Sequence, residues 1–186
     1  NVFSDIRKAA NDYVDLSLPI ITLCSHNHAG MNAMHLSRCK SPGKSPIVKK
    51  WSERTKTTRE DLDKWFSYCN NANIGLVLGD TGTWNIIGVD IDGNYGEKLW
   101  KTFCAKRAVP PTWEFSTGNG RRLLFLLPLG VRTQKHKVNW KAGHEELAFI
   151  ASGQQTVVPP SIHTSGKKYT WIANRSPVDM DCAEAP

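Results

Sequence analysis

The sequence contains no long apolar run, no internal repeat and no low-complexity tract. Because no stretch reaches about 18 apolar residues, it predicts no transmembrane helix and no membrane partner. Cysteine is also scarce: the five thiols are odd in number and irregularly spaced, unlike the even sets of secreted disulfide frameworks. We therefore expect a reducing, cytoplasmic setting.

Acidic residues are outnumbered by basic ones, with 17 Asp and Glu against 24 Lys and Arg, a formal net charge of +7. This surplus suits a polyanionic partner such as nucleic acid or nucleotide phosphates, although a merely soluble basic protein has the same charge. The 186 residues suffice for a hydrophobic core without disulfides. We expect one domain over residues 1–175, with the acidic, Pro-containing segment 176–186 as a tail or the start of a linker.

Helix and strand patterns alternate in the first half of the chain, and strand patterns dominate the second. Apolar stripes predict helices over residues 4–15 and 97–108, and Thr57 to Glu60 form a capping-box signature for a further helix. Apolar runs predict strands at residues 19–24, 73–78, 84–92, 112–116, 122–127, 146–151, 156–158 and 169–172. This order predicts an α+β fold.

Two aspartates alternate with apolar residues at the end of the predicted strand 84–92. Since side chains on a strand alternate between its faces, Asp90 and Asp92 share one face, about 6–7 Å apart. Paired carboxylates of this kind suit divalent cations such as Mg²⁺ or Mn²⁺. The alternative is a polar strand end closed by the turn at Gly93.

A glycine-rich turn lies between two predicted strands and is followed by two arginines. Glycines let backbone amides approach an anion, and hydroxyls and guanidinium groups add donors, as a triphosphate requires. An ordinary hairpin turn is the alternative. The candidate nucleotide-binding residues are Ser116, Thr117, Gly118, Asn119, Gly120 and Arg122.

Pro159 and Pro160 end a predicted strand and present Ser161 and His163 on a turn. A hydroxyl and an imidazole in this position suit a phosphate or a sugar hydroxyl. The alternative is a surface turn with a capping serine.

The long polar stretch 25–50 is typical of functional or mobile loops. Together with Cys24, it holds two thiols and three imidazoles within sixteen positions, and four of these side chains suit a structural zinc ion: Cys24, His28, His35 and Cys39. Lys44, Lys49 and Lys50 lie near Trp51, a combination that suits a nucleic-acid strand. The alternatives are plain loop residues and a solvated lysine face.

In their order along the chain, these segments resemble the prim-pol family, the bifunctional primase/polymerase domain of the archaeo-eukaryotic primases. The resemblance covers about residues 10 to 172. It rests on the segments Gly43-Lys-Ser-Pro46 with Trp51, Asn73 to Gly79, Asp90 to Asp92, Pro111-Thr-Trp113, Ser116 to Gly120, Pro159 to His163, Ser165-Gly166 and Tyr169-Thr-Trp171.

The resemblance implies an RNA-recognition-like, mixed or antiparallel sheet with flanking helices. It also implies a metal-dependent nucleotidyltransferase that makes or extends primers on single-stranded DNA in replication of a plasmid, phage or mobile element. Its partners would be nucleoside triphosphates, the DNA template and primer, and a helicase domain or protein. Asp90 and Asp92 match the metal-binding pair, and Ser161 and His163 match the closing turn near the nucleotide.

Two positions depart from the family pattern. Arg122 stands where the family usually has a histidine, and Ala148 stands where an acidic residue is expected, with Glu146 two residues earlier on the same strand face. We expect Glu146 to be the third catalytic carboxylate. If no third acid reaches the metals, the alternative is a non-catalytic single-strand or origin DNA-binding module. Another Asp-x-Asp metal enzyme, such as a glycosyltransferase or nuclease, leaves the segment Pro159 to His163 unexplained.

Overall fold

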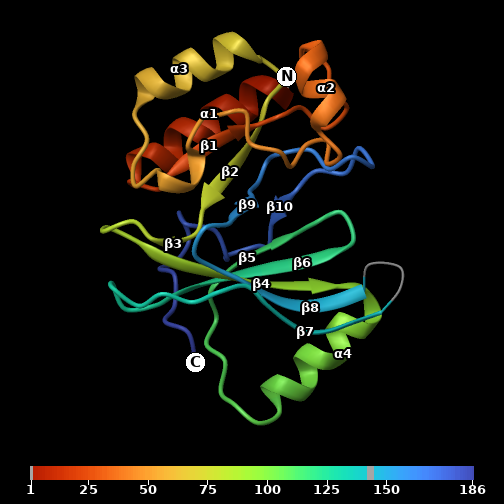
Figure 1. Ribbon diagram of the computed structural model, residues 1–186. Helices are drawn as coiled ribbons and strands as arrows, with labels where there is room; N and C mark the ends of the chain where they lie inside the picture. Colours follow the sequence, from red (N-terminus) through yellow and green to blue (C-terminus); the bar gives the residue numbers. More distant parts are fainter. Residues whose placement is uncertain (1, 142–144) are drawn as a thin grey trace. The chain divides into compact units, whose positions relative to one another are not determined.

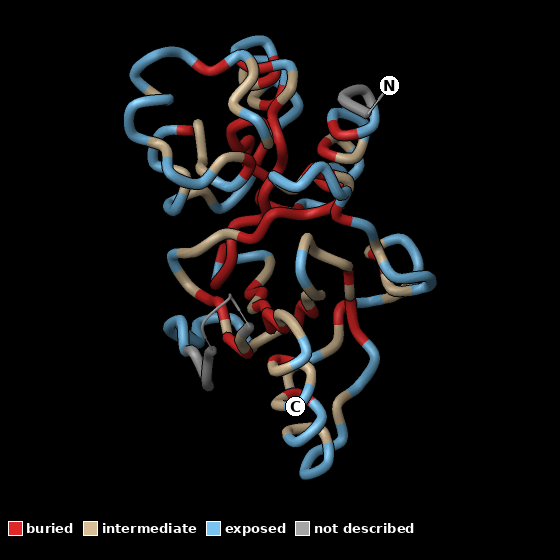
Figure 2. The backbone as a smooth tube through the Cα atoms, turned by 90° about the vertical axis from the view of Figure 1, so that its right-hand side faces the viewer, coloured by how far each residue is buried: buried red, intermediate tan, exposed pale blue. Residues whose placement is uncertain are grey.

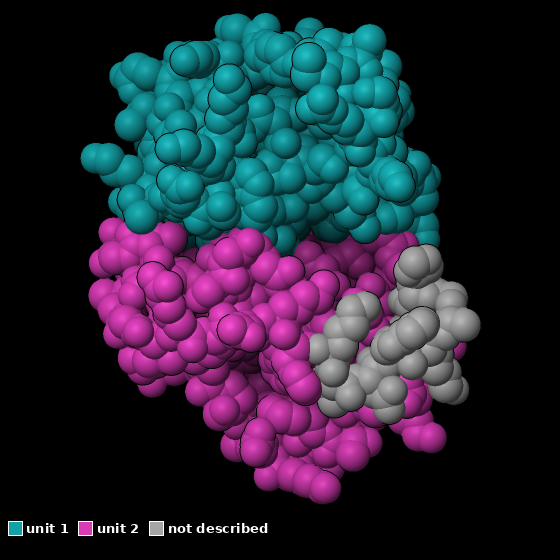
Figure 3. All heavy atoms as spheres, in the orientation of Figure 1, with its two compact units in different colours: residues 1–77, 155–169 teal, residues 78–154, 170–186 magenta. Residues whose placement is uncertain are grey.

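The computed structural model describes residues 2–141 and 145–186 (Figure 1). The chain divides into two compact units, coloured separately in Figure 3. Unit 1 comprises residues 1–77 and 155–169, and unit 2 comprises residues 78–154 and 170–186.

Unit 1 combines helices with a three-stranded antiparallel sheet of order β1-β2-β9. Every residue of β1 and β2 is buried, and Figure 2 shows buried stretches inside the chain's fold with exposed loops around them. The elements of unit 1 are α1 (Val2–Asp15), β1 (Ile20–Leu23), α2 (Ala33–Arg38), the 3-10 helix η1 (Trp51–Glu53), α3 (Arg59–Tyr68), β2 (Asn73–Val77) and β9 (Gln155–Val157).

The predicted capping box of α3 lies one residue further along the chain than the sequence suggested. Thr58 is the N-cap: its hydroxyl accepts a hydrogen bond from the amide of Asp61, and the Asp61 carboxylate accepts one from the amide of Thr58. Thr57 is buried instead and donates to the carbonyl of Ile20 at 2.6 Å. Thr58 therefore caps α3, and Thr57 connects the start of this helix to β1.

Unit 2 is built on an antiparallel sheet of order β10-β5-β6-β4-β8-β7, with β3 paired to β4. Together with the sheet of unit 1, it confirms the expected α+β class with antiparallel sheets and few helices. The elements of unit 2 are β3 (Gly79–Asp80), β4 (Asn85–Asp92), α4 (Gly93–Cys104), β5 (Trp113–Ser116), β6 (Gly120–Leu126), β7 (His136–Lys141), β8 (Glu145–Ile150) and β10 (Thr170–Trp171).

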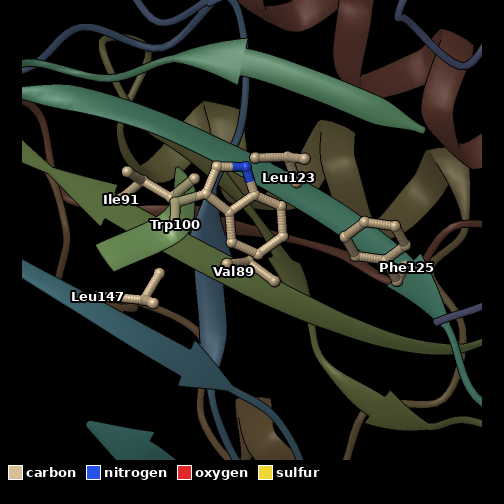
Figure 4. Close-up of a cluster of buried hydrophobic side chains, with 6 residues drawn as sticks. All are labelled: Val89, Ile91, Trp100, Leu123, Phe125 and Leu147. Atoms are coloured by element: carbon tan, nitrogen blue, oxygen red, sulfur yellow. The ribbon is translucent and has the colours of Figure 1, made fainter. Parts of the chain in front are cut away.

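One face of this sheet carries a hydrophobic core cluster of unit 2. Trp100 of α4 packs against apolar side chains from the three central strands (Figure 4). These side chains are Val89 and Ile91 of β4, Leu123 and Phe125 of β6, and Leu147 of β8. Alternate residues of the same strands point to the opposite face, where the candidate site lies.

Helix α4 begins four residues before the predicted start and ends four before the predicted end. It follows β4 directly, with Gly93 at a φ of +65° making the bend between strand and helix. Gly96 lies so close to β8 that a Cβ there would come within 2.3 Å of the Glu146 carbonyl oxygen. Glycine usually disfavours a helix, but here Gly93 makes the bend between β4 and α4, and Gly96 allows α4 to lie close to β8.

Residues 176–186 were expected to form a tail or the start of a linker, but in the structure they pack onto unit 2. The amide of Leu126 donates to Ala183, and the amide of Ala185 donates back to Leu126. Cys182 is buried, and the Trp113 indole donates to the carbonyl of Met180. Within residues 2–141 and 145–186, no helix has the length and apolar character of a membrane span.

Candidate functional site

The three carboxylates singled out in the sequence converge on one face of the unit 2 sheet. Asp90 and Asp92 lie two residues apart on β4, and Asp92 pairs in register with Glu146 of β8. One carboxylate oxygen from each of the three lies within 4.8 Å of the others. Ala148, the position where an acid was expected, pairs with Asp90, so Glu146 is the residue of β8 that joins the cluster.

Arg122 contacts this carboxylate cluster from the neighbouring strand β6. It pairs in register with Asp90, and its Nη2 and Nε lie 2.5 and 3.1 Å from Asp90 Oδ1. Both side chains are largely buried, with exposed fractions of 14% and 13%, so solvent screens this ion pair weakly. Formally, three carboxylates and one guanidinium sum to −3 + 1 = −2, the charge that one divalent cation neutralises.

Arg121 points to the opposite face and has a different set of partners. It donates to both carboxylate oxygens of Glu97 on α4 and to Glu114 on β5. This bonding raises the pKa of Arg121 above its usual value, and the hydrogen bond from Arg121 lowers the pKa of Glu97. Arg121 therefore ties α4 to the sheet.

The glycine-rich turn lies directly beside the carboxylates. Gly120 pairs with Asp92, and a Cβ at Gly120 would come within 3.0 Å of Asp92 Oδ1. The hydroxyl of Thr117 accepts hydrogen bonds from the amides of Gly120 and Asn119, and the amide of Gly93 donates to the Asn119 carbonyl. The turn, the end of β4 and the start of α4 are thereby joined.

The other predicted nucleotide-binding residues of the turn differ in how they are placed. The hydroxyl of Ser116 donates to the Thr170 carbonyl of β10 at 3.3 Å. Gly118 is half-buried at the tip of the turn, between Thr117 and Asn119. Arg122 lies beyond the turn on β6, with its guanidinium on Asp90.

Ser161 and His163 belong to unit 1, and the structure separates their roles. Ser161 is fully buried; its hydroxyl accepts from the amide of Ile74 and donates to the Ile74 carbonyl. Because its hydroxyl is hydrogen-bonded inside the core, Ser161 stabilises β2. This differs from the expectation that Ser161 contacts a nucleotide.

His163 is half-buried and accepts a hydrogen bond from the amide of Ser165 on Nδ1, which places the imidazole proton on Nε2. Burial lowers the pKa of His163, and the positive charges of Lys44 and Lys167 lower it further. A neutral imidazole among lysines offers an anion an N–H donor in a positive environment.

The amide side chain of Asn73 connects two loops of unit 1, one that carries Lys44 and one that carries His163. It donates to the carbonyls of Gly43 and Ile162 and accepts from the amide of Ile162. Asn73 is buried and satisfied on both its oxygen and its nitrogen, so it fixes Lys44 and His163 on adjoining segments.

Unit 1 also brings together the four predicted zinc ligands. Cys24, His28, His35 and Cys39 each offer one ligand atom, and these atoms lie within 4.8 Å of one another. His26, the remaining histidine of the stretch, is outside this group.

Two adjoining pockets of about 510 and 400 Å³ lie between α2 and α3 and share Ile47, Val48, Lys49 and Tyr68. Together they form what we call the basic groove. Its cationic side chains are Arg38, Lys49, Arg54 and Lys64, and its aromatic side chains are Trp65 and Tyr68.

The basic groove includes only one of the three lysines predicted to bind DNA. Lys49 lines both pockets, whereas neither pocket includes Lys44 or Lys50 among its lining residues. The sequence reasoning missed Arg54, Lys64 and Trp65. Lys64 and Trp65 are neighbours on α3, a basic residue beside an aromatic one, whereas Arg54 precedes that helix; only the packing of these segments places all three near Lys49.

The antiparallel sheet of unit 2 thus brings three carboxylates together beside a glycine-rich turn, and these are the hard oxygen ligands that divalent cations favour. The family model described as "Bifunctional DNA primase/polymerase, N-terminal" matches residues 10–186. The chain belongs to this prim-pol family. Domains of the family generally use divalent metals, and membership points to a DNA primase/polymerase. Among curated proteins, none matches the chain.

Proposed function

We propose that this chain transfers nucleotides from nucleoside triphosphates to a primer on single-stranded DNA, with Asp90, Asp92 and Glu146 holding the divalent metals. The observation that carries the proposal is the convergence of the three carboxylates beside the Gly120 turn. Mg²⁺ and Mn²⁺ favour such hard oxygen ligands. When bound, the metals neutralise phosphate charge and activate the attacking hydroxyl.

The residues around the carboxylates prepare the site for this reaction. A 3′-hydroxyl of the primer, or of a first nucleotide, attacks the α-phosphate, and pyrophosphate leaves. Arg122 holds Asp90 by Oδ1, so it would orient this carboxylate for the metals and keep a permanent positive charge beside the phosphates. The turn from Ser116 to Gly120 grips the triphosphate. Catalysis is then chiefly positioning and charge stabilisation.

The basic groove of unit 1 supplies the proposed contact to single-stranded DNA. Lys49, Lys64 and Arg38 face phosphates, while the ring of Tyr68, which is 55% exposed, offers a base a stacking surface. The proposed setting, replication of a plasmid, phage or mobile element beside a helicase, rests on family membership alone.

The deciding experiment is calorimetric titration of a deoxynucleoside triphosphate with and without Mn²⁺. We expect metal-dependent binding in the wild type and none in the Asp90→Ala/Asp92→Ala double variant. The control is Asp63→Ala, which removes an exposed carboxylate from α3. Primer extension in the same proteins must follow the same pattern. Full extension by the double variant excludes the assigned carboxylates.

The second candidate, a non-catalytic single-strand or origin DNA-binding module, is favoured by the groove and by the engagement of Asp90 with Arg122. It predicts DNA binding without metal-dependent triphosphate binding. The neighbouring lysines give a matched pair for the groove itself. Lys49→Ala should weaken single-stranded DNA binding and reduce its salt dependence more than Lys50→Ala.

A further inference from the structure

The segment around α2 in unit 1 folds back against β1 with little apolar support. None of the six residues of α2 is buried, and Met34 and Leu36 are 65% and 48% exposed. Isolated helices shorter than about 12–15 residues are marginal in water. Another interaction must therefore hold α2 in place.

The Cys and His side chains at the base of this segment have the separations of metal ligands. Cys24 Sγ lies 3.9 Å from Cys39 Sγ, and His28 Nε2 lies 3.2 Å from Cys39 Sγ. Zinc–sulfur and zinc–nitrogen bonds in a tetrahedron place ligand atoms about 3.3–3.8 Å apart. The two sulfur atoms are well beyond the length of about 2.05 Å that a disulfide requires.

His35 supplies an independent sign that a ligand belongs here. In the described part of the chain, its Nε2 atom is buried and has no hydrogen-bond partner. Its ring meets that of His28 edge to face, with centroids 5.4 Å apart and planes at 85°, so that both imidazoles reach the thiols. A buried ring nitrogen without a partner is costly unless an ion satisfies it.

Local hydrogen bonds bring the four side chains to one point. The hydroxyl of Ser25 donates to the carbonyl of Ala29, and His28 adopts a φ of +62°, which closes the turn after Cys24. Asn32 caps α2 by accepting from the amide of His35. His35 and Cys39 are four residues apart, one helical turn, and so share a face.

We infer that Cys24, His28, His35 and Cys39 bind one structural Zn²⁺ ion, which anchors α2 to β1. Four protein ligands complete a tetrahedral shell and leave no position for a substrate. The hydroxyl of Ser45 accepts a hydrogen bond from the Cys39 thiol at 3.0 Å, and it would donate one to the zinc-bound thiolate instead. His35, Cys39 and Ser45 also line the basic groove, so the ion fixes one of its walls. The inference does not depend on the carboxylates of unit 2.

Metal content of the full chain tests the inference directly. We expect one zinc ion per chain after purification, and a tetrahedral thiolate spectrum when Co²⁺ replaces it. Cys39→Ser and His35→Ala should lose the ion, whereas Cys104→Ser and His26→Ala should keep it, because these two residues are outside the group. A wild-type chain that binds neither metal, or a Cys39→Ser variant that retains a full equivalent, overturns the inference.

Hydrogen exchange tests the anchoring role in the wild-type protein, without any variant that must fold. Removing zinc with a chelator should raise the exchange of the amides of residues 35–39 at least tenfold and leave those of β4 unchanged. Restoring zinc should restore protection. Zinc removal without faster exchange in α2 contradicts the anchoring role, and loss of triphosphate binding is not expected in either case.

Discussion

Around Asp90 and Asp92, the two faces of the unit 2 sheet carry different kinds of side chain, although the same strands supply both; elsewhere the second face is apolar too, with Ile86, Phe115 and Leu124 fully buried. The face under α4 is apolar, with Val89 and Phe125 in its core, whereas the other face presents Asp90 and Asp92. The neighbouring arginines follow this division. Arg121 is saturated by Glu97 and Glu114, and Arg122 meets Asp90.

Neighbouring residues of one strand therefore have different roles: one side chain stabilises the fold, and the next can take part in the proposed reaction. On the α4 face, a side chain gains free energy by leaving water. On the acidic face, like charges are held together at a cost that a cation relieves. Substitutions of the apolar residues under α4 should therefore change unfolding, and those of Asp90 and Asp92 should change nucleotide transfer.

The largest expected effect is on the apolar face. Phe125→Ala should destabilise the protein by about 3–5 kcal/mol, because it leaves a cavity against the core. Urea unfolding measures this change. A loss below about 1 kcal/mol, the level of an ordinary surface substitution, contradicts the assignment of this face as the core.

On the acidic face, Asp92→Asn should slow primer extension about 10²–10³-fold, since it removes charge that holds the catalytic metals. Its urea midpoint should stay close to that of the wild type. The measurement is the extension rate at saturating triphosphate and Mn²⁺. An enzyme that keeps half of its rate without Asp92 refutes the role given to this carboxylate.

The adjacent arginines allow the sharpest comparison. Arg122→Ala should weaken triphosphate binding about tenfold through loss of a charge-assisted bond. Arg122→Lys should recover only part of the lost affinity, because lysine keeps the positive charge but lacks the planar, two-pronged set of donors of the guanidinium group. Arg121→Ala should leave triphosphate affinity unchanged and lower the free energy of unfolding instead. Calorimetry measures the change in triphosphate affinity, and urea unfolding measures the change in stability. Equal losses of affinity in the Arg121→Ala and Arg122→Ala variants would contradict the distinction between the two faces.

The smallest expected effect is a pH dependence from Glu97. Because Arg121 lowers the pKa of Glu97 below its ordinary value of 4.5, the unfolded chain binds the proton more readily. The ion pair therefore stabilises the fold above pH 4.5, and this stabilisation fades as the pH falls through the lowered pKa. After solvent screening it amounts to less than about 1 kcal/mol. Glu97→Gln should remove that part of the acid dependence in unfolding curves measured from pH 6 to 3.

Much of the site was predictable because it depends on local periodicity. The alternation around Asp90 and Asp92 gives their shared face, and Glu146 followed from the same rule on the neighbouring strand. The proposed zinc ligands were predictable from their residue types and their nearness in the sequence. For these residues the fold adds the register and the turns that bring the side chains together.

The remaining features depend on contacts between distant segments. The burial of Ser161 against Ile74 and the early start of α4 at Gly93 have no local signature. Residues 136–141 were not predicted as a strand, and α2 was taken for loop. The division into two units likewise arises because residues 155–169 return to the first segment through β9.

Gly96 of α4 lies close to the backbone of Glu146, the third carboxylate, from the other side of the sheet. A Cβ at this position would come within 2.3 Å of the Glu146 carbonyl oxygen, so a side chain there would push against the backbone of Glu146. An added carbon atom on the α4 side of the sheet would therefore displace the backbone of Glu146, and with it the proposed metal site, without altering any carboxylate.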